Sequence, residues 1–262
     1  MHNPTSAGST LQLQRREHVA VLTLARPDFR NAVSDQMWEE IGDMLQALAT
    51  DDSIRAVVLT GAGKAFCSGG DISGMRERFA LPPEQRSRHA FLRQGRTAEH
   101  LESLAALGKP TVAALNGIAA GVGCDLALAC DYIVSNSFGG FMFSYVARGL
   151  VPDGSAYLLP RRVGLAKSKY LLLAGKRVDG AEALTLGLID EVVENDELLD
   201  RAVAVAAEMS AGPAVSVAMT KSLLNQSYEH AAKESFNLAR HAQTICITTQ
   251  EHQDAVAEFL KR

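Results

Sequence analysis

Two glycine-rich segments could place bare main-chain amides beside a ligand. Residues 65–72 read AFCSGGDI and follow an apolar run, while residues 116–125 read NGIAAGVGCD and precede another. Glycine lacks the Cβ atom that keeps the backbone of other residues away from a bound molecule. If the two turns converge, their N–H groups form an oxyanion hole, in which one donor is worth ~2.7–4 kcal/mol of transition-state stabilisation. The alternative for either turn is a tight link between a strand and a helix.

Two aspartates could move a proton beside such an oxyanion hole. Asp125 ends the second glycine turn, and Asp153 stands 28 residues later, directly after Pro152. A carboxylate can take a proton from one carbon and return it to another, and a well-placed one contributes ~10²–10⁴-fold to the rate. The structural alternatives are a Pro-Asp-Gly turn for Asp153 and a carboxylate favoured in the first turn of a helix for Asp125.

Other site chemistries lack their motifs. The stretch from Gly61 to Lys64 lacks the GxxxxGK[ST] spacing of a phosphate loop, and the turn at Gly121 lacks the third glycine of a dinucleotide fingerprint. No GxSxG motif of a serine hydrolase occurs. The four cysteines form no CxxC pair and have no histidines at zinc-ligand spacing, so we expect reduced thiols and no metal.

Alternating strand and helix patterns precede a largely helical end. Short apolar runs predict strands over residues 19–24, 56–60, 111–115 and 132–135, and Ser34 is the expected cap of a helix. Residues 88–107 and 124–130 also read as helices, and the helical pattern is nearly continuous from about residue 158. The sequence therefore predicts an α/β core with the active site over residues 10–200, followed by a helical region for oligomerisation over residues 201–262.

The composition is that of an ordinary globular protein. The chain has 262 residues, of which 47% are hydrophobic and 21% charged, and its net charge is -4. This charge gives no support to a nucleic-acid or membrane-surface partner. The first ten residues do not resemble a secretory signal, and no stretch of 18 apolar residues occurs. We expect a cytoplasmic protein.

Four strings resemble, in order, the signatures of the crotonase (enoyl-CoA hydratase/isomerase) superfamily. They are RPDFRNA at 26–32, VVLTGAGKAFCSGGDI at 57–72, AALNGIAAGVGCDLALACDYIV at 113–134 and GLVPDG at 149–154. The tail EHQDAVAEFLKR is similar to the closing helix of that family. The resemblance implies a spiral of ββα units that forms two near-perpendicular sheets, with C-terminal helices that assemble trimers or hexamers. It also implies an acyl-coenzyme A substrate and no separate cofactor.

The resemblance assigns roles to particular residues. The two oxyanion amides fall on Gly70 and Val122, where Val122 replaces the usual glycine but keeps the N–H. The wall that holds the coenzyme A arm is expected at a set of residues around the first turn, namely Arg30, Ala32, Ser68, Asp71 and Ile72.

The acid pattern departs from that of the family's hydratases, which use two glutamates. Asp125 stands at the first glutamate position and Tyr145 at the second, and no glutamate occurs between Cys124 and Ala181. Tyr145 is then either a substrate-binding residue or an ordinary packed aromatic. Family isomerases of the dienoyl-CoA and phenylacetyl-CoA epoxide types resemble this chain in carrying an acid at the place of Asp153. The sequence thus favours an enoyl-CoA isomerase that uses Asp125 and Asp153.

Three alternative functions remain open. They are an enoyl-CoA hydratase or dehydratase, a thioesterase or dehalogenase, and a non-catalytic or RNA-binding member of the family.

One segment carries an excess of positive charge. Between residues 76 and 96 there are six arginines (76, 78, 86, 88, 93 and 96) and only two glutamates (77 and 84). Arginine suits phosphate groups, so one or two of these side chains, or Arg30, are candidates to bind the phosphates of coenzyme A. The alternative is a solvated helix face.

Overall fold

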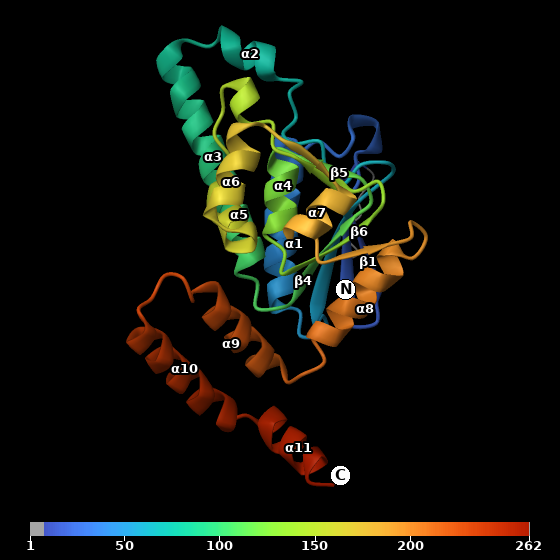
Figure 1. The fold of residues 1–262 in the computed structure, drawn as a ribbon, viewed down its shortest axis with the longest axis vertical. Coiled ribbons are helices and arrows are strands. Elements are labelled where there is room, and N and C mark those ends of the chain that lie inside the picture. Colours follow the sequence, from blue (N-terminus) through green and yellow to red (C-terminus); the bar gives the residue numbers. More distant parts are fainter. Residues whose placement is uncertain (1–7, 262) are drawn as a thin grey trace.

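A twisted, mostly parallel sheet organises the molecule (Figure 1). The computed structural model describes residues 8–261, and of residues 75–77 it describes the backbone only. The main sheet has the order β1-β2-β3-β4-β6-β9, in which β1 and β2 are antiparallel and the other neighbours parallel. Its strands are β1 (Leu11–Arg16), β2 (Val19–Leu24), β3 (Ala56–Gly61), β4 (Thr111–Leu115), β6 (Tyr132–Asn136) and β9 (Glu191–Val193).

Both faces of this sheet are covered, which explains its continuously apolar strands. On β2, Leu22 and Leu24 join the larger core, which includes α1 (Asp35–Thr50), α3 (Pro83–Ala105) and α4 (Val122–Leu128). Val19 and Val21 point the other way, into a second core beneath α8 (Leu198–Met209). The predicted strands over 19–24, 56–60, 111–115 and 132–135 are confirmed.

A small second sheet stands beside the main one. It consists of β5 (Ile118–Ala120), β7 (Gly140–Met142) and β8 (Arg177–Asp179), in the order β5-β7-β8. The remaining helices are α2 (Met75–Ala80), α5 (Ser155–Val163), α6 (Leu165–Leu173) and α7 (Gly180–Leu186), with 3₁₀ turns η1 (Pro27–Phe29) and η2 (Val146–Arg148). The expected architecture of a ββα spiral with C-terminal helices is confirmed.

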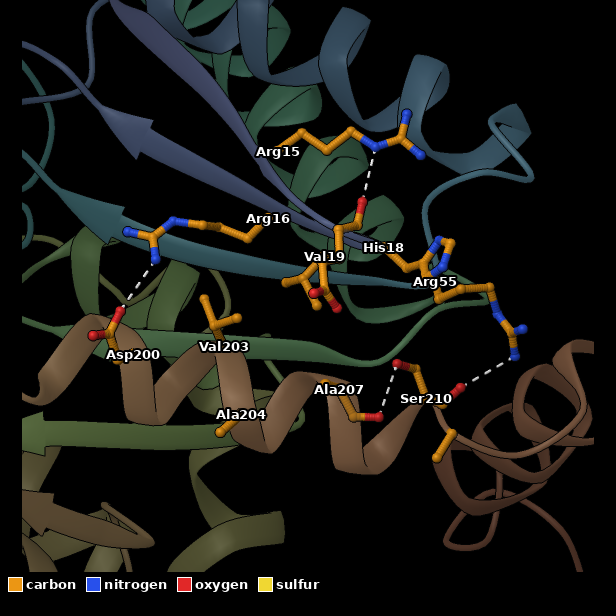
Figure 2. A pocket seen from close by; sticks show the side chains of 12 residues that line it. Arg15, Arg16, His18, Val19, Arg55, Asp200, Val203, Ala204, Ala207 and Ser210 are labelled. Atoms are coloured by element: carbon orange, nitrogen blue, oxygen red, sulfur yellow. Dashed lines mark hydrogen bonds and ion pairs between the residues drawn. The ribbon is translucent and has the colours of Figure 1, made fainter.

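Helix α8 is fastened to the sheet by polar contacts as well as by its apolar face. A surface pocket lies where the β1–β2 turn meets α8 (Figure 2). There Arg16 pairs with Asp200 at 3.2 Å, and Arg55 donates a hydrogen bond to the Ser210 carbonyl at 3.1 Å. The division expected at residue 200 stays a prediction, and residue 200 lies within α8, which packs on the sheet.

The last three helices form a C-terminal arm, comprising α9 (Ala214–Asn225), α10 (Ala232–Ile247) and α11 (Gln250–Phe259). Figure 1 shows α10 and α11 extending away from the sheet. Glu251 of α11 accepts hydrogen bonds from the first two amides of α9, Ala214 at 3.2 Å and Val215 at 3.3 Å. Several large apolar side chains of α10 and α11 are exposed: Phe236, Ile245, Ile247, Val256 and Phe259.

No single helix of the described chain is long and apolar enough to cross a membrane, although α8 and α9, bent by 99°, would pass together by length and composition alone. The four cysteines, all in the described part, are free thiols. Burial raises the pKa of Cys67 and Cys130 to about 12, so these two thiols stay protonated and unreactive.

Candidate active site

The two glycine turns lie against each other, as the sequence led us to expect. Cys67 pairs with Ala119 as a β-bridge, and the Ala120 amide donates to the Cys67 carbonyl at 2.8 Å. Gly69 and Gly121 have φ of 103° and 53°, which residues with a side chain rarely adopt. A Cβ at Gly69 would lie 3.1 Å from the Ala120 carbonyl oxygen, closer than side chains normally come. Glycine is thus needed for both the turn conformation and the close approach.

The amides of Gly70 and Val122 are free to bind a ligand. Across residues 8–261, neither N–H donates a hydrogen bond to another group of the chain. Gly70 is exposed, and a Cβ built on it meets no atom within 4 Å, so the space in front of it is open. Val122 is the first residue of α4 and directly follows the turn glycine. Two unpaired donors on adjacent turns are the arrangement that an oxyanion hole requires.

Two asparagines, which sequence reasoning missed, hold the first turn in place. Asn31 is fully buried, and its side-chain amide donates to the carbonyls of Ala62 at 2.9 Å and Ala65 at 2.8 Å. Asn116 also donates to Ala65, at 3.2 Å, and accepts from the Gly61 amide at 3.2 Å. Asn31 has a left-handed φ of 56°. The asparagines at the ends of the RPDFRN and AALN strings were their only signal.

The residues expected to form the coenzyme A wall surround the first turn. Arg30 is exposed, with φ of 49°, and its carbonyl accepts the Ser68 amide at 2.9 Å. The Ser68 hydroxyl donates to the Phe29 carbonyl at 3.2 Å. Ile72 is 69% exposed, so it could cover a ligand that lies across the turn.

Ala32 and Asp71 are engaged within the protein instead. Ala32 is buried, and its carbonyl accepts a hydrogen bond from Arg26 at 2.5 Å. The Asp71 carboxylate forms an ion pair with the same arginine at 2.8 Å. Although burial opposes it, the hydrogen bonds from Ser73 and Arg26 hold the pKa of Asp71 below its usual value. This aspartate therefore orients the turn, and its charge is already balanced.

Asp125 is enclosed completely, and both of its oxygens are occupied. Its Oδ1 accepts hydrogen bonds from the Ser155 hydroxyl and from the Ser155 amide, the latter at 2.5 Å. Its Oδ2 lies 2.8 Å from the hydroxyl of Tyr145. Burial raises the pKa of Asp125 to about 6, against the opposing effect of these hydrogen bonds. With no exposed surface, the carboxyl is not placed to touch a substrate. Direct proton transfer by Asp125, expected from the sequence, stays a prediction, and this enclosure makes Asp125 the less accessible of the two acids.

Asp153 has the opposite surroundings. Its side chain is exposed to solvent, and within the described chain its carboxylate makes no hydrogen bond and no ion pair. The surrounding protein still raises the pKa of Asp153, and the guanidinium of Arg93 opposes the rise. Asp153 stands two residues before Ser155, whose amide and hydroxyl bind Asp125, and its charge contributes to the raised pKa of Asp125. Of the two acids, Asp153 is the one that a ligand can reach.

Tyr145 fills the place where the family's hydratases carry a second glutamate. Its side chain is 5% exposed, and its hydroxyl reaches the Gly121 carbonyl at 2.5 Å as well as Asp125. Burial raises the pKa of Tyr145 far above its ordinary value, so the phenol keeps its proton. It therefore joins the second glycine turn to Asp125. Ser155, the other partner of Asp125, directly follows the GLVPDG string, and nothing in the sequence distinguishes it from a turn residue.

A cavity of about 710 Å³ opens beside Asp153, between α3, α5 and α9. Its lining includes the apolar side chains of Leu101 and Leu158 together with Tyr157 and Arg161, and no residue of the two glycine turns. The space is large enough for an acyl group. A carboxylate at its edge could exchange protons with the carbons of that group.

The arginines between residues 76 and 96 differ in what they contact. Arg78 donates to the Asp71 carbonyl at 3.3 Å, and Arg96 pairs with Glu39 at 3.4 Å. Arg93 forms no ion pair with Asp153 within the described chain, but its charge opposes the rise in the pKa of that carboxyl. The side chain of Arg76 lies outside the described residues. Arg30 and Arg88 are both exposed and have no side-chain partner among residues 8–261, so these two arginines are available to a phosphate.

Among the described residues, no group of three or more His, Cys, Asp or Glu side chains could hold a metal ion. The chemistry available at the site is thus that of free amides and one reachable carboxylate.

The comparisons with known proteins agree with this arrangement. The family model described as "Enoyl-CoA hydratase/isomerase" matches residues 14–262. The short-chain-enoyl-CoA hydratase of Clostridium acetobutylicum is 31% identical over 95% of this chain and 94% of its own. The 1,2-epoxyphenylacetyl-CoA isomerase of Escherichia coli is 30% identical over 93% of this chain and 92% of its own.

A crystal structure of an enoyl-CoA hydratase from Mycobacterium smegmatis superposes with a TM-score of 0.87 and 32% identity, covering 96% of each chain. The match extends over the sheet, the glycine turns and the C-terminal helices alike. This chain therefore belongs to the enoyl-CoA hydratase/isomerase family, within the crotonase superfamily, and is an enzyme that acts on acyl-coenzyme A thioesters.

Proposed function

We propose that this enzyme is an enoyl-CoA isomerase, which shifts a carbon–carbon double bond along the acyl chain. The observation that carries the proposal is the unequal exposure of its two acids. Asp125 is enclosed, Asp153 is reachable, and Tyr145 stands where water addition would require a second glutamate. A double-bond shift needs one carboxylate that takes and returns a proton, whereas the family's hydration uses two.

The reaction would proceed through a dienolate. The Asp153 carboxylate takes a proton from C2 of a 3-enoyl-CoA, and the electron pair moves onto the thioester oxygen. The amides of Gly70 and Val122 donate hydrogen bonds to that oxygen and stabilise its charge. Asp153 then returns the same proton to C4, which leaves the double bond between C2 and C3. No oxidant, reductant or water is consumed.

Hydration or dehydration is the second candidate. The hydratase of Clostridium acetobutylicum is as similar to this chain as the isomerase of Escherichia coli, at 31% against 30% identity. Asp125 and Asp153 are also close enough to influence each other, so a pair of acids exists. Under this reading, water would enter between Asp153 and the acyl group.

The two candidates give opposite absorbance changes. Conversion of a 3-enoyl-CoA to the conjugated 2-enoyl-CoA raises the near-ultraviolet absorbance, whereas hydration of crotonyl-CoA lowers it. We expect the first activity to dominate, Asp153→Asn to lower it by ~10²-fold or more, and Asp125→Asn to retain most of it. Faster hydration of crotonyl-CoA than isomerisation, or an active Asp153→Asn variant, would contradict the assignment.

We also propose that the enzyme works as a homotrimer or hexamer. The exposed apolar side chains of α10 and α11 support this, because a monomer would leave that surface in water.

A further inference from the structure

The second oxyanion donor, the Val122 N–H, belongs to a peptide whose carbonyl oxygen is also hydrogen-bonded. The carbonyl of Gly121 and the N–H of Val122 are two ends of the same planar amide, so fixing one fixes the direction of the other. The Tyr145 hydroxyl lies 2.5 Å from that carbonyl oxygen, which also accepts the amides of Cys124 at 2.7 Å and Asp125 at 3.4 Å. A hydrogen bond to the carbonyl also polarises the amide and makes its N–H a stronger donor.

Counting protons gives this contact a direction. The Tyr145 oxygen lies 2.5 Å from the Gly121 carbonyl and 2.8 Å from Asp125 Oδ2, yet the phenol has one proton to donate. The Gly121 carbonyl accepts this proton, and so does Asp125 when its carboxyl is ionised. When Asp125 is protonated on Oδ2, the carboxyl donates to the phenol and the phenol proton goes to Gly121 alone. Burial, which raises the pKa of Asp125 to about 6, favours this second state. Ser155 does not compete for Oδ2, because its hydroxyl and amide both donate to Asp125 Oδ1.

The backbone of Tyr145 is itself well fixed. Its carbonyl accepts hydrogen bonds from the Arg148 amide at 2.9 Å and the Leu150 amide at 3.0 Å, which close the η2 turn. The side chain is buried, and Asp125 and Ser155 surround its hydroxyl. The phenol therefore has little freedom to turn away from Gly121.

We propose that Tyr145 is a positioning residue for the oxyanion hole, in a chain that runs from the Asp125 carboxyl through the Tyr145 hydroxyl to the Gly121–Val122 peptide. The residue that replaces the second hydratase glutamate would thus act on the substrate through the backbone. This inference rests on the proposed oxyanion hole but not on which reaction the enzyme catalyses.

The carbonyl stretch of a bound, unreactive acyl-CoA measures the oxyanion hole directly. We suggest butyryl-CoA labelled with ¹³C at the thioester carbon, observed by infrared difference spectroscopy. It has no double bond to shift or hydrate. In the wild-type enzyme the band should move to lower frequency on binding, because the two amides polarise the carbonyl. Tyr145→Phe should lose half or more of this shift and ~10-fold in kcat, with KM changed less than about threefold.

Two further variants separate positioning from folding. Asp125→Asn keeps a donor behind Tyr145, because the side-chain amide can replace the carboxyl proton, so the band shift should be retained. Replacing Tyr145 with 3-fluorotyrosine leaves the shape almost unchanged but makes the phenol more acidic, so the shift should increase even if Tyr145→Phe does not fold. Tyr170→Phe, on the exposed face of α6, is the control for loss of a tyrosine hydroxyl.

The outcomes are distinct. No band shift in the wild-type enzyme would remove the oxyanion hole, and with it the proposed function. A normal wild-type shift that is unchanged in both Tyr145→Phe and the fluorotyrosine enzyme would overturn the positioning role alone. Loss of the shift in Asp125→Asn but not in Tyr145→Phe would contradict the proposed order of contacts, in which Asp125 acts through Tyr145 on the Gly121–Val122 peptide.

Discussion

Asp125 and Asp153 are chemically identical, and their surroundings make them different acids. Hydrogen bonds occupy both oxygens of Asp125, whereas Asp153 stays open at the edge of a cavity. Neither environment is visible in the sequence, because that of Asp125 depends on Tyr145 and Ser155, which are 20 and 30 positions away, and that of Asp153 depends on α3 and α9, which are still farther away along the chain. The sequence predicted which residues matter, and it could not predict that Tyr145 and Ser155 would enclose one acid.

The raised pKa of Asp153 predicts where activity is lost on the acid side. Asp153 must be ionised to take a proton, so the rate falls as pH falls through its pKa. Because the protein raises this pKa, the acid limb of kcat/KM should lie above the ordinary aspartate value of about 3.9. Arg93→Gln removes an opposing cation and should move the limb to still higher pH. If the acid limb of kcat/KM has the ordinary aspartate pKa, or if it does not move in Arg93→Gln, then a group other than Asp153 controls the rate at low pH.

At the scale of elements, burial decides what the sequence could predict. Strands β2, β3, β4 and β6 are apolar on both faces and were found, and Ser34 caps α1 as expected by accepting the Met37 amide at 3.1 Å. Strands β5, β7, β8 and β9 have three residues each, which is too few to show the alternation of apolar and polar residues that identifies a strand. Helix α5 was not delimited from the sequence, and Pro160 inside it interrupts the usual pattern.

The first glycine turn predicts a strict dependence on one main-chain amide. Gly70→Pro deletes the N–H and should lower kcat by ~10²-fold or more. Gly70→Ala is the matched variant, because it keeps the N–H and its Cβ meets no atom within 4 Å. We expect the alanine variant to lose far less activity. Turnover of a folded Gly70→Pro enzyme within about threefold of wild type would exclude this amide from the mechanism.

The segment from η1 to α3 predicts a contact with the phosphates of coenzyme A. The side chain of Arg30 is exposed and unpaired among the described residues, so Arg30→Ala should raise KM for an acyl-CoA. Added salt should likewise raise KM for the wild-type enzyme, because it screens exposed charges. Neither change should affect an acyl-pantetheine, which lacks the nucleotide phosphates. Parallel salt curves for the two substrates would mean that these arginines are only surface residues.

At the scale of the whole molecule, the C-terminal arm predicts self-association. Phe236 and Phe259 are 75% and 74% exposed, on helices that extend away from the sheet. We expect light scattering to give the mass of three or six chains, and Phe236→Glu to shift the population toward smaller species. Phe138→Glu, at a similarly exposed site outside the arm, is the control. A wild-type protein that is monomeric at micromolar concentration would contradict this expectation.

The contact of Glu251 with the first amides of α9 means that the end of the chain helps to hold α9 in place. Helix α9 in turn carries Lys221, whose ammonium binds Asp131 at 2.7 Å, and Asp131 accepts the first amide of β4 at 2.7 Å. The final helix is thus linked to the middle of the sheet through the side chains of Glu251, Lys221 and Asp131. Shortening the protein by its last dozen residues would release the start of α9 and loosen a strand more than a hundred positions upstream. For the same reason, a purification tag should be attached at the N-terminus.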